Sequence, residues 1–285
     1  MVLSPISIQD CFARKNGEGR GVLIPYLTAG YPDAETSLEL MGTLVAAGAD
    51  VLELGIPFSD PLADGPTIQR SSYKALEKGM TVERALGILR RFRADHDVPV
   101  VLFGYLNPIL QFGMGEFLSA AVESGAQGLL LTDLPAGADQ ELEGQVISSD
   151  LDLIRLLAPT TPRHRIREVA GGGSGFLYYI SRTGVTGAQM ELRADLGREV
   201  ATVRQEVDLP IAVGFGISTP EQASIVAGVS EGVVVGSALL DALDQGGIEG
   251  AGTFLKGIRN GMDAPRIASQ AVLAKETGPA GPEVS

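Results

Sequence analysis

Short apolar runs recur along the chain, and each is rich in valine, isoleucine, leucine or tyrosine. Near-continuous apolarity over about four to eight residues is typical of parallel strands that are buried on both faces. Eight such runs are present, and they predict strands at residues 21–27, 50–56, 98–105, 128–133, 152–158, 175–181, 210–216 and 232–238.

The stretches between these runs have helical character. Residues 34–48 place Leu38, Met41, Leu44 and Val45 on one face, which is the pattern of an amphipathic helix. Further helices are predicted at 81–92, 115–125, 137–149, 162–170, 195–207 and 220–228. Strand and helix alternating eight times predict an α/β fold, a (β/α)8 TIM barrel with a parallel eight-stranded ring and outer helices. A doubly wound open sheet is the alternative, but no glycine-rich dinucleotide motif follows the first strand.

Length and composition agree with one barrel. The 285 residues are interpreted as a single domain over 1–262, followed by a small, polar C-terminal tail at 263–285 that is expected to be partly disordered. Glycine is unusually frequent, with 37 residues, so the fold needs many tight turns or close backbone approaches.

Charge and cysteine content exclude several classes of protein. A net charge of −13 without a basic cluster disfavours binding to nucleic acid or to an anionic membrane surface. The single cysteine, Cys11, cannot form an intrachain disulfide, and with only two histidines no zinc-type cluster is available. The N-terminus lacks the pattern of a signal peptide, and no apolar run is long enough to cross a membrane. We therefore expect a soluble, cytoplasmic protein.

In a barrel of this kind the active site lies at the carboxyl ends of the strands. The second predicted strand carries Glu53 among apolar residues, with Val51, Glu53 and Gly55 on one face. If this face lines the barrel interior, burial favours the protonated carboxylic acid, which could then serve as a general acid. The alternative is that Glu53 forms a buried ion pair.

Two more carboxylates follow the same strand. Asp60 and Asp64 lie four residues apart in a loop rich in proline and glycine. Together with Glu53 they suggest acid–base chemistry, although each could instead be a turn former whose side chain bonds its own backbone.

Glycine clusters follow the last three predicted strands, in the runs SRTGVTG, VGFGIS and VGSA. Glycine after the seventh and eighth strands of a barrel, followed by a helix, directs backbone N–H groups toward a shared point that can hold a phosphate. The alternative is that these glycines only make tight turns. Aromatic residues near strand ends, namely Tyr26, Tyr178 and Phe215, could line an apolar pocket or belong to the core.

These motifs carry a family resemblance. The runs ELGIPFSDPLADGPTIQ, PYLTAGYPD, YISRTGVTGA, VGFGIS and VGSA resemble those of the tryptophan synthase alpha subunit, and the likeness extends over residues 8–262. The resemblance implies a carbon–carbon lyase that cleaves indole-3-glycerol phosphate to indole and glyceraldehyde 3-phosphate in tryptophan biosynthesis.

The resemblance also assigns roles to individual residues. It implies that Glu53 is the principal acid/base residue and that Asp64 is the second catalytic carboxylate. It implies phosphate binding by Gly187, Gly216, Gly236 and Ser237, an indole pocket formed by Tyr26, Thr186 and Phe215, and a position near the substrate for Tyr178. Two residues depart from the family pattern, since Tyr26 replaces a frequent phenylalanine and Phe103 a frequent leucine.

The resemblance implies no metal or cofactor, because acid and base groups suffice for the reaction. It further implies that the chain passes indole to a beta subunit in an alpha2beta2 heterotetramer. Three alternatives remain open: another phosphate-sugar barrel such as a phosphoribosyl isomerase, a stand-alone indole-releasing lyase, and a subunit without catalysis that only activates a partner.

Overall fold

The computed structural model describes residues 5–181, 189–214 and 216–264. All strands pair in parallel, and each of the eight predicted strands is confirmed. Their bounds are β1 (Val22–Thr28), β2 (Leu52–Gly55), β3 (Val100–Gly104), β4 (Gly128–Leu131), β5 (Asp152–Leu153), β6 (Arg155–Leu157), β7 (Leu177–Ile180), β8 (Ile211–Gly214) and β9 (Gly232–Val235). β5 and β6 are two pieces of one predicted strand, separated only by Ile154.

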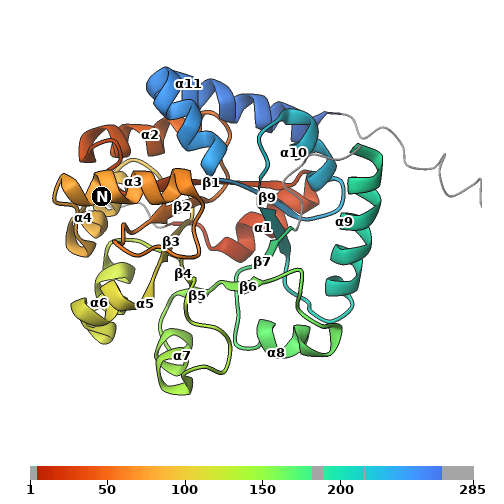
Figure 1. Cartoon of the computed structure of the whole chain (residues 1–285), viewed down its shortest axis with the longest axis horizontal. Coiled ribbons are helices and arrows are strands. Elements are labelled where there is room, and N and C mark those ends of the chain that lie inside the picture. The colour runs from red at the N-terminus through yellow and green to blue at the C-terminus, as the bar shows by residue number, and fades with distance from the viewer. Residues whose placement is uncertain (1–4, 182–188, 215, 265–285) are drawn as a thin grey trace, which may run out of the picture.

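The sheet closes into a barrel at this break. The strand order is β5-β4-β3-β2-β1-β9-β8-β7-β6, so the two pieces flanking Ile154 hold the two ends of the sheet together. The Ile154 N–H donates to the carbonyl of Leu129 at 2.9 Å, which continues the ladder of β4 past β5. The helices surround the ring of strands (Figure 1). This closure confirms the barrel and excludes the open doubly wound sheet.

The pairing register gives the stagger of the barrel. Starting at Tyr26 of β1, successive paired residues pass through β2, β3 and β4 and end at Asp152 of β5. Starting at Val22 of β1, they pass the other way through β9, β8 and β7 and end at Leu156 of β6. The two residues of β1 are four apart, as are the two residues on β5 and β6, so one circuit shifts the register by eight residues. Eight strands with a shear of eight are the geometry of TIM barrels.

Seven predicted helices are present with shifted ends: α2 (Ala34–Ala46), α4 (Val82–Phe92), α6 (Met114–Glu123), α7 (Gln140–Ile147), α8 (Ile166–Ala170) after the 3-10 helix η1 (Arg163–Arg165), α9 (Gln189–Arg204) and α10 (Pro220–Ala227). Several begin at side-chain caps, and Thr219 with Gln222 forms a full capping box at α10. Three helices were not predicted: α1 (Ile8–Gly17), α3 (Pro66–Glu77) and α5 (Leu106–Phe112). A helix after the last strand was expected without bounds, and α11 (Ser237–Asp263) begins there.

Side chains from alternate strand positions fill the barrel interior. An inner cluster joins strand residues with Ile8, Cys11 and Phe12 of α1, whose helix thus closes the amino-terminal end of the ring. The other members of this cluster lie in the strands or directly beside them: Val22, Ile24, Val51, Val101, Leu130, Ile154, Phe176, Ala212 and Val234. Because this end is plugged, a substrate can enter the barrel only at the carboxyl ends of the strands.

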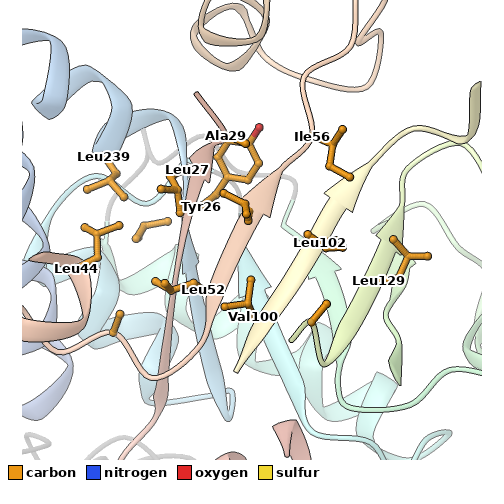
Figure 2. Close-up of a cluster of buried hydrophobic side chains, with 14 of the residues drawn as sticks. Tyr26, Leu27, Ala29, Leu44, Leu52, Ile56, Val100, Leu102, Leu129 and Leu239 are labelled. Atoms are coloured by element: carbon orange, nitrogen blue, oxygen red, sulfur yellow. The ribbon is translucent and has the colours of Figure 1, made fainter. Parts of the chain in front are cut away.

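The opposite faces of the strands pack against the helices. Figure 2 shows leucines of neighbouring strands, among them Leu27, Leu52 and Leu102, with Leu44 of α2 and Leu239 of α11 on the side of Leu27. All of these side chains are fully buried. The strands are therefore apolar on both faces, which is why their sequence lacks the alternation of a half-exposed strand.

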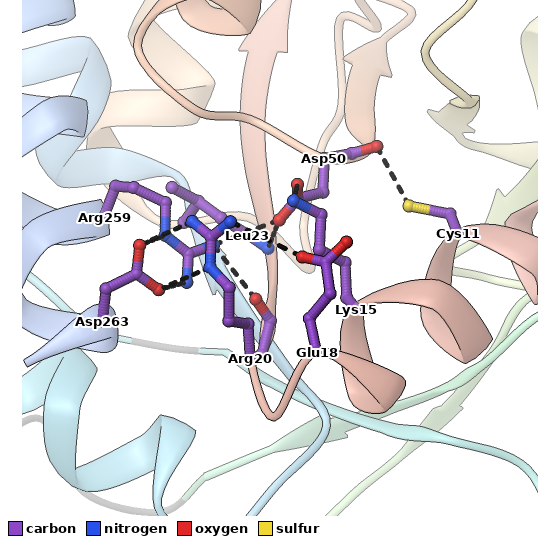
Figure 3. A network of polar contacts seen from close by, with 9 residues as sticks. Cys11, Lys15, Glu18, Arg20, Leu23, Asp50, Arg259 and Asp263 are labelled. Atoms are coloured by element: carbon purple, nitrogen blue, oxygen red, sulfur yellow. Dashed lines mark hydrogen bonds and ion pairs between the residues drawn. The ribbon is translucent and has the colours of Figure 1, made fainter. Parts of the chain in front are cut away.

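An ionic network fastens the amino-terminal end of the barrel (Figure 3). Asp50, just before β2, pairs with Lys15 of α1 at 2.8 Å and with Arg259 of α11 at 3.1 Å, and it accepts the Leu23 N–H at 2.9 Å. Arg259 also donates to the carbonyl of Gly21 at 3.0 Å. The network ties the plugging helix, two strands and the last helix together, at the end of the barrel opposite the carboxyl ends of the strands.

The predicted tail begins where α11 ends, at Asp263, and residues 265–285 lie outside the described part of the chain. In the part that the structure describes, no helix is both long enough and apolar enough to span a membrane.

Candidate active site

Glu53 lies in the middle of β2 on the inner face of the barrel, between Tyr26 of β1 and Val101 of β3 in the register. Its side chain is 1% exposed, and its Oε1 atom has no hydrogen-bond partner. Burial raises the pKa of this carboxyl to about 8. No ion pair to Glu53 is found among the described residues, so the structure gives no support to the ion-pair alternative.

Asp64 lies in the loop after β2, one residue before the N-cap of α3. Its half-buried position raises its pKa to about 6, and a hydrogen bond with the Tyr105 hydroxyl opposes part of that rise. The same hydroxyl accepts the Ala63 N–H at 3.1 Å, so Tyr105 holds the backbone of this loop as well as its carboxylate. Asp60 is exposed and bound to the neighbouring Ser59 hydroxyl, as expected of a turn residue.

Two tyrosines lie over glycines at the mouth of the barrel. A side chain at Gly55 would collide with the Tyr26 ring, and one at Gly214 would collide with Tyr178. Burial raises the pKa of both hydroxyls, and the charges of Asp64 and Glu53 raise it further. Both carboxylates therefore act electrostatically on both tyrosines, and Tyr26 lies directly beside Glu53 in the strand register.

The two departures from the family pattern contact each other. The rings of Tyr26 and Phe103 pack edge to face, with centroids 5.2 Å apart. The extra hydroxyl of Tyr26 lies 3.2 Å from that of Thr28, which in turn lies 2.7 Å from the Ser71 hydroxyl of α3. The added hydroxyl thus finds a buried partner, and the chain of hydroxyls connects β1 to α3.

The candidate phosphate site lies at the start of α11. Gly236 precedes the helix and its carbonyl accepts the first helical N–H groups, from Leu239 and Leu240. The N–H groups of Ser237 and Ala238 come before these and have no acceptor within the helix, as at every helix start. A Cβ atom at Gly65 would lie 4.0 Å from the Ser237 Oγ, so the Asp64 loop adjoins this helix start.

The structure brings together most of the predicted site residues that it describes: Tyr26, Glu53, Asp64, Tyr178, Gly236 and Ser237. Gly216 follows β8 at the same end, and its φ of 78° favours glycine there. Thr186, Gly187 and Phe215 lie outside the described residues. Within the described ranges, no group of three or more His, Cys, Asp or Glu side chains could hold a metal ion.

Sequence reasoning missed Tyr105, Thr28 and Ser71. Tyr105 and Thr28 could have been found by the rule already applied to Glu53, because each lies at the carboxyl end of a strand. Ser71 carried no such signal, since the helix that contains it was not predicted.

From the burial of Glu53 we predict how the free energy of unfolding depends on pH. Its pKa rises from 4.5 in the unfolded chain to about 8 in the fold, so between these pH values only the unfolded chain releases this proton. The free energy of unfolding should therefore fall with rising pH, by at most about 1.4 kcal/mol per pH unit. Urea unfolding of Glu53→Gln and the unchanged chain measures the effect. We expect the stability difference to shift in favour of the variant from pH 5 to pH 8, and a difference independent of pH would contradict the burial of this acid.

Comparison with known proteins identifies a matching family. The model of the family described as tryptophan synthase alpha chain matches residues 12–260. The tryptophan synthase alpha chain of Citrifermentans bemidjiense is 47% identical over 259 residues, covering 90% of this chain and 97% of its own length. That of Gluconobacter oxydans is 46% identical over 237 residues, covering 83% and 88%.

Solved structures agree. The crystal structure of tryptophan synthase subunit alpha from Legionella pneumophila superposes with a TM-score of 0.83 at 38% identity, covering 90% of this chain and 98% of that one. A chain of tryptophan synthase from M. tuberculosis, in an aminoacrylate-bound form, superposes with a TM-score of 0.81 at 31% identity, covering 90% and 100%.

Proposed function

The chain belongs to the tryptophan synthase alpha chain family, and from this premise we propose that Glu53 and Asp64 carry out the cleavage of indole-3-glycerol phosphate at the mouth of the barrel. The reaction of the family yields indole and glyceraldehyde 3-phosphate. The observation that carries the assignment is the buried, unpaired carboxyl of Glu53, held beside the Asp64 loop.

Glu53 exchanges its proton twice in the proposed mechanism. Cleavage of the bond between indole C3 and the glycerol carbon needs an electron sink, which protonation of C3 creates. The pKa near 8 keeps Glu53 protonated at neutral pH, so it can donate this proton. The resulting carboxylate then takes the proton of the neighbouring hydroxyl as the carbonyl group forms and the carbon–carbon bond breaks. Glu53 ends the cycle protonated, as it began.

Asp64 has the complementary task. Positive charge grows on the indole ring nitrogen when C3 is protonated, and a carboxylate next to the ring N–H stabilises it. The pKa of about 6 leaves Asp64 ionised at neutral pH, and the Tyr105 hydrogen bond orients it. Tyr26 and Tyr178 offer apolar ring surface for the indole. The backbone N–H groups that follow Gly236 at the start of α11, with Ser237, bind the phosphate in this proposal. Gly216, Gly187 and the pocket residues Thr186 and Phe215 complete the proposed binding site.

These two carboxyl groups predict the pH dependence of the reaction. The active form holds Asp64 ionised and Glu53 protonated, so kcat/KM should rise with a pKa near 6 and fall with one near 8. Initial rates from about pH 5 to about pH 9 would define the profile. Asp64→Asn should be slower and should lose the acid limb while it keeps the alkaline one. If Asp64→Asn lost the alkaline limb instead, Asp64 would be the group that must be protonated and Glu53 the group that must be ionised.

Members of this family work with a beta subunit, and we propose that this chain passes indole to one in an alpha2beta2 heterotetramer in the cytoplasm. Apolar side chains on the catalytic face support a docking surface: Leu62, next to Asp64 in its loop, is 89% exposed, and Leu110 of α5 is 45% exposed. Apolar surface of this kind often marks an interface.

Indole release tests the proposed function. We expect the isolated full-length chain to cleave indole-3-glycerol phosphate slowly and a beta subunit to accelerate the reaction, because a partner can order loops that complete a site. Full activity of the lone chain, unchanged by any beta subunit, would favour the stand-alone lyase. No indole from the chain in either condition would favour a subunit without catalysis.

A further inference from the structure

α3 lies between the two ends of the proposed substrate site. It begins at Pro66, two residues after Asp64. Its first turns pack on the start of α11, because a Cβ atom at Gly236 would lie 3.7 Å from Ile68. The position of α3 relative to α11 therefore sets the distance between the Asp64 carboxylate and the proposed phosphate site.

A set of polar contacts between partly exposed side chains fixes the position of α3 relative to α11. Arg70 of α3 donates to Asp244 at 2.7 Å and lies 3.3 Å from Asp241, and both carboxylates belong to α11. Thr67 of α3 donates to Asp241 at 3.1 Å. The Tyr31 hydroxyl, from the loop after β1, donates to the other oxygen of Asp244. We call these five residues the α3–α11 clamp.

We infer that Arg70 is a positioning residue for the cleavage reaction, which it serves by holding α3, and with it Asp64, at a fixed span from the start of α11. The inference rests on the proposed function, which places phosphate at Gly236 and Ser237. The substrate is a single molecule, so its phosphate and its indole N–H are held at a span set by its covalent structure. A protein that meets both ends must hold its own groups at the matching span, and a misplacement of about 1 Å can cost as much as 100-fold in rate.

The contacts of Arg70 argue against a direct role in binding phosphate. Its guanidinium group is occupied by two carboxylates, and hydrogen bonding to Asp244 raises its pKa. The clamp holds two acidic groups for one arginine, so its own charge does not favour an anion. Arg70 therefore acts through the helices that it joins.

The inference is tested by comparing the whole substrate with inorganic phosphate, which corresponds to only one end of the substrate. The variants Arg70→Gln and Arg70→Lys are compared with the unchanged full-length chain in kcat/KM for indole-3-glycerol phosphate and in competitive inhibition by inorganic phosphate alone. Arg91→Gln is the matched control, because Arg91 forms a similarly exposed pair with Glu35, at 2.7 Å, between α4 and α2, which carry no proposed site residue. Thermal unfolding of all variants shows whether the fold is kept.

We expect Arg70→Gln to lower kcat/KM about tenfold while inhibition by inorganic phosphate stays within about twofold, since only the span between the two sites has changed. Arg70→Lys should recover part of the loss, because one ammonium group can pair with one of the carboxylates at a time. Arg91→Gln should leave both quantities unchanged.

Two results would overturn the inference: kcat/KM of Arg70→Gln within twofold of the unchanged chain, or a loss matched by an equal weakening of phosphate inhibition, which would make Arg70 part of the anion site. Neither result bears on the proposed function, which fails separately if the unchanged chain releases no indole from indole-3-glycerol phosphate with or without a beta subunit.

Discussion

Replacing Glu53 by glutamine should abolish most of the lyase activity while substrate still binds. Glutamine keeps the shape of the side chain in its buried position on β2 but cannot give and retake a proton. A general acid or base contributes about 10²–10⁴-fold, and Glu53 serves in two steps, so we expect kcat to fall by at least about 10³-fold. KM should change little, because the helix start at Gly236 and the rings of Tyr26 and Tyr178 are untouched. Steady-state rates of indole formation measure both constants.

Two comparisons make the result specific to proton transfer. The glutamine variant should be at least as stable as the unchanged chain at pH 8, because it removes a buried acid, so lost activity cannot be ascribed to unfolding. Asp64→Asn should lower kcat by less, since it weakens the stabilisation of one charge and leaves proton transfer intact. A Glu53→Gln variant with more than about a tenth of the original kcat, a loss under ~1.4 kcal/mol, would remove Glu53 from the mechanism.

The sequence predicts the strands of this fold more reliably than its helices. Most residues of the barrel strands are buried on both faces, so the strands appear as apolar runs with few charged interruptions. The break at Ile154, where the sheet closes, was not predicted, because nothing in the local run of residues marks it and the closure depends on strands that are far away in the chain.

The unpredicted helix α3 shows what the apolar pattern cannot detect. Its fully buried residues are Ser71, Ser72 and Ala75, so it presents small side chains to the barrel rather than an apolar stripe. It also follows a loop rich in proline and glycine. Its position depends on hydrogen bonds, from Ser71 to Thr28 and from Arg70 to α11, and these contacts join residues that are distant in sequence.

The proposed catalytic residues could be found in the sequence, but their surroundings could not. Glu53 was detectable because a charged residue inside an apolar strand is costly unless it has a function or a partner. Its unpaired state was not, since a partner could have come from any strand of the barrel. The same holds for Asp64 and Asp60, which look alike in the sequence but differ in the fold, where Asp64 is half-buried beside the Tyr105 hydroxyl and Asp60 is exposed.

Replacing Gly236 by valine should raise KM for indole-3-glycerol phosphate by about 100-fold or more. The proposed site holds the phosphate through backbone N–H groups at the start of α11, and each such charge-assisted hydrogen bond is worth roughly 1.5–3 kcal/mol. A Cβ atom at this position would lie 3.6 Å from Tyr26 and 3.7 Å from Ile68, which is ordinary contact, so the fold accepts a side chain there. We expect the two methyl groups of valine to crowd the space beside the N–H groups that follow Gly236 and so to exclude the anion.

The position suits this test better than Gly216, whose φ of 78° makes any side chain strained and would confuse a folding defect with a binding defect. Gly236→Ala should be intermediate, because its single methyl group leaves part of the space open. Gly115→Val is the matched control, since Gly115 lies in α6 with no atom within 4 Å of an added Cβ, and it should leave KM unchanged. Inhibition by inorganic phosphate provides an independent measure and should weaken in step with KM. If both constants of Gly236→Val equalled those of the Gly115→Val control, the phosphate would bind elsewhere, and the start of α11 would be a structural turn only.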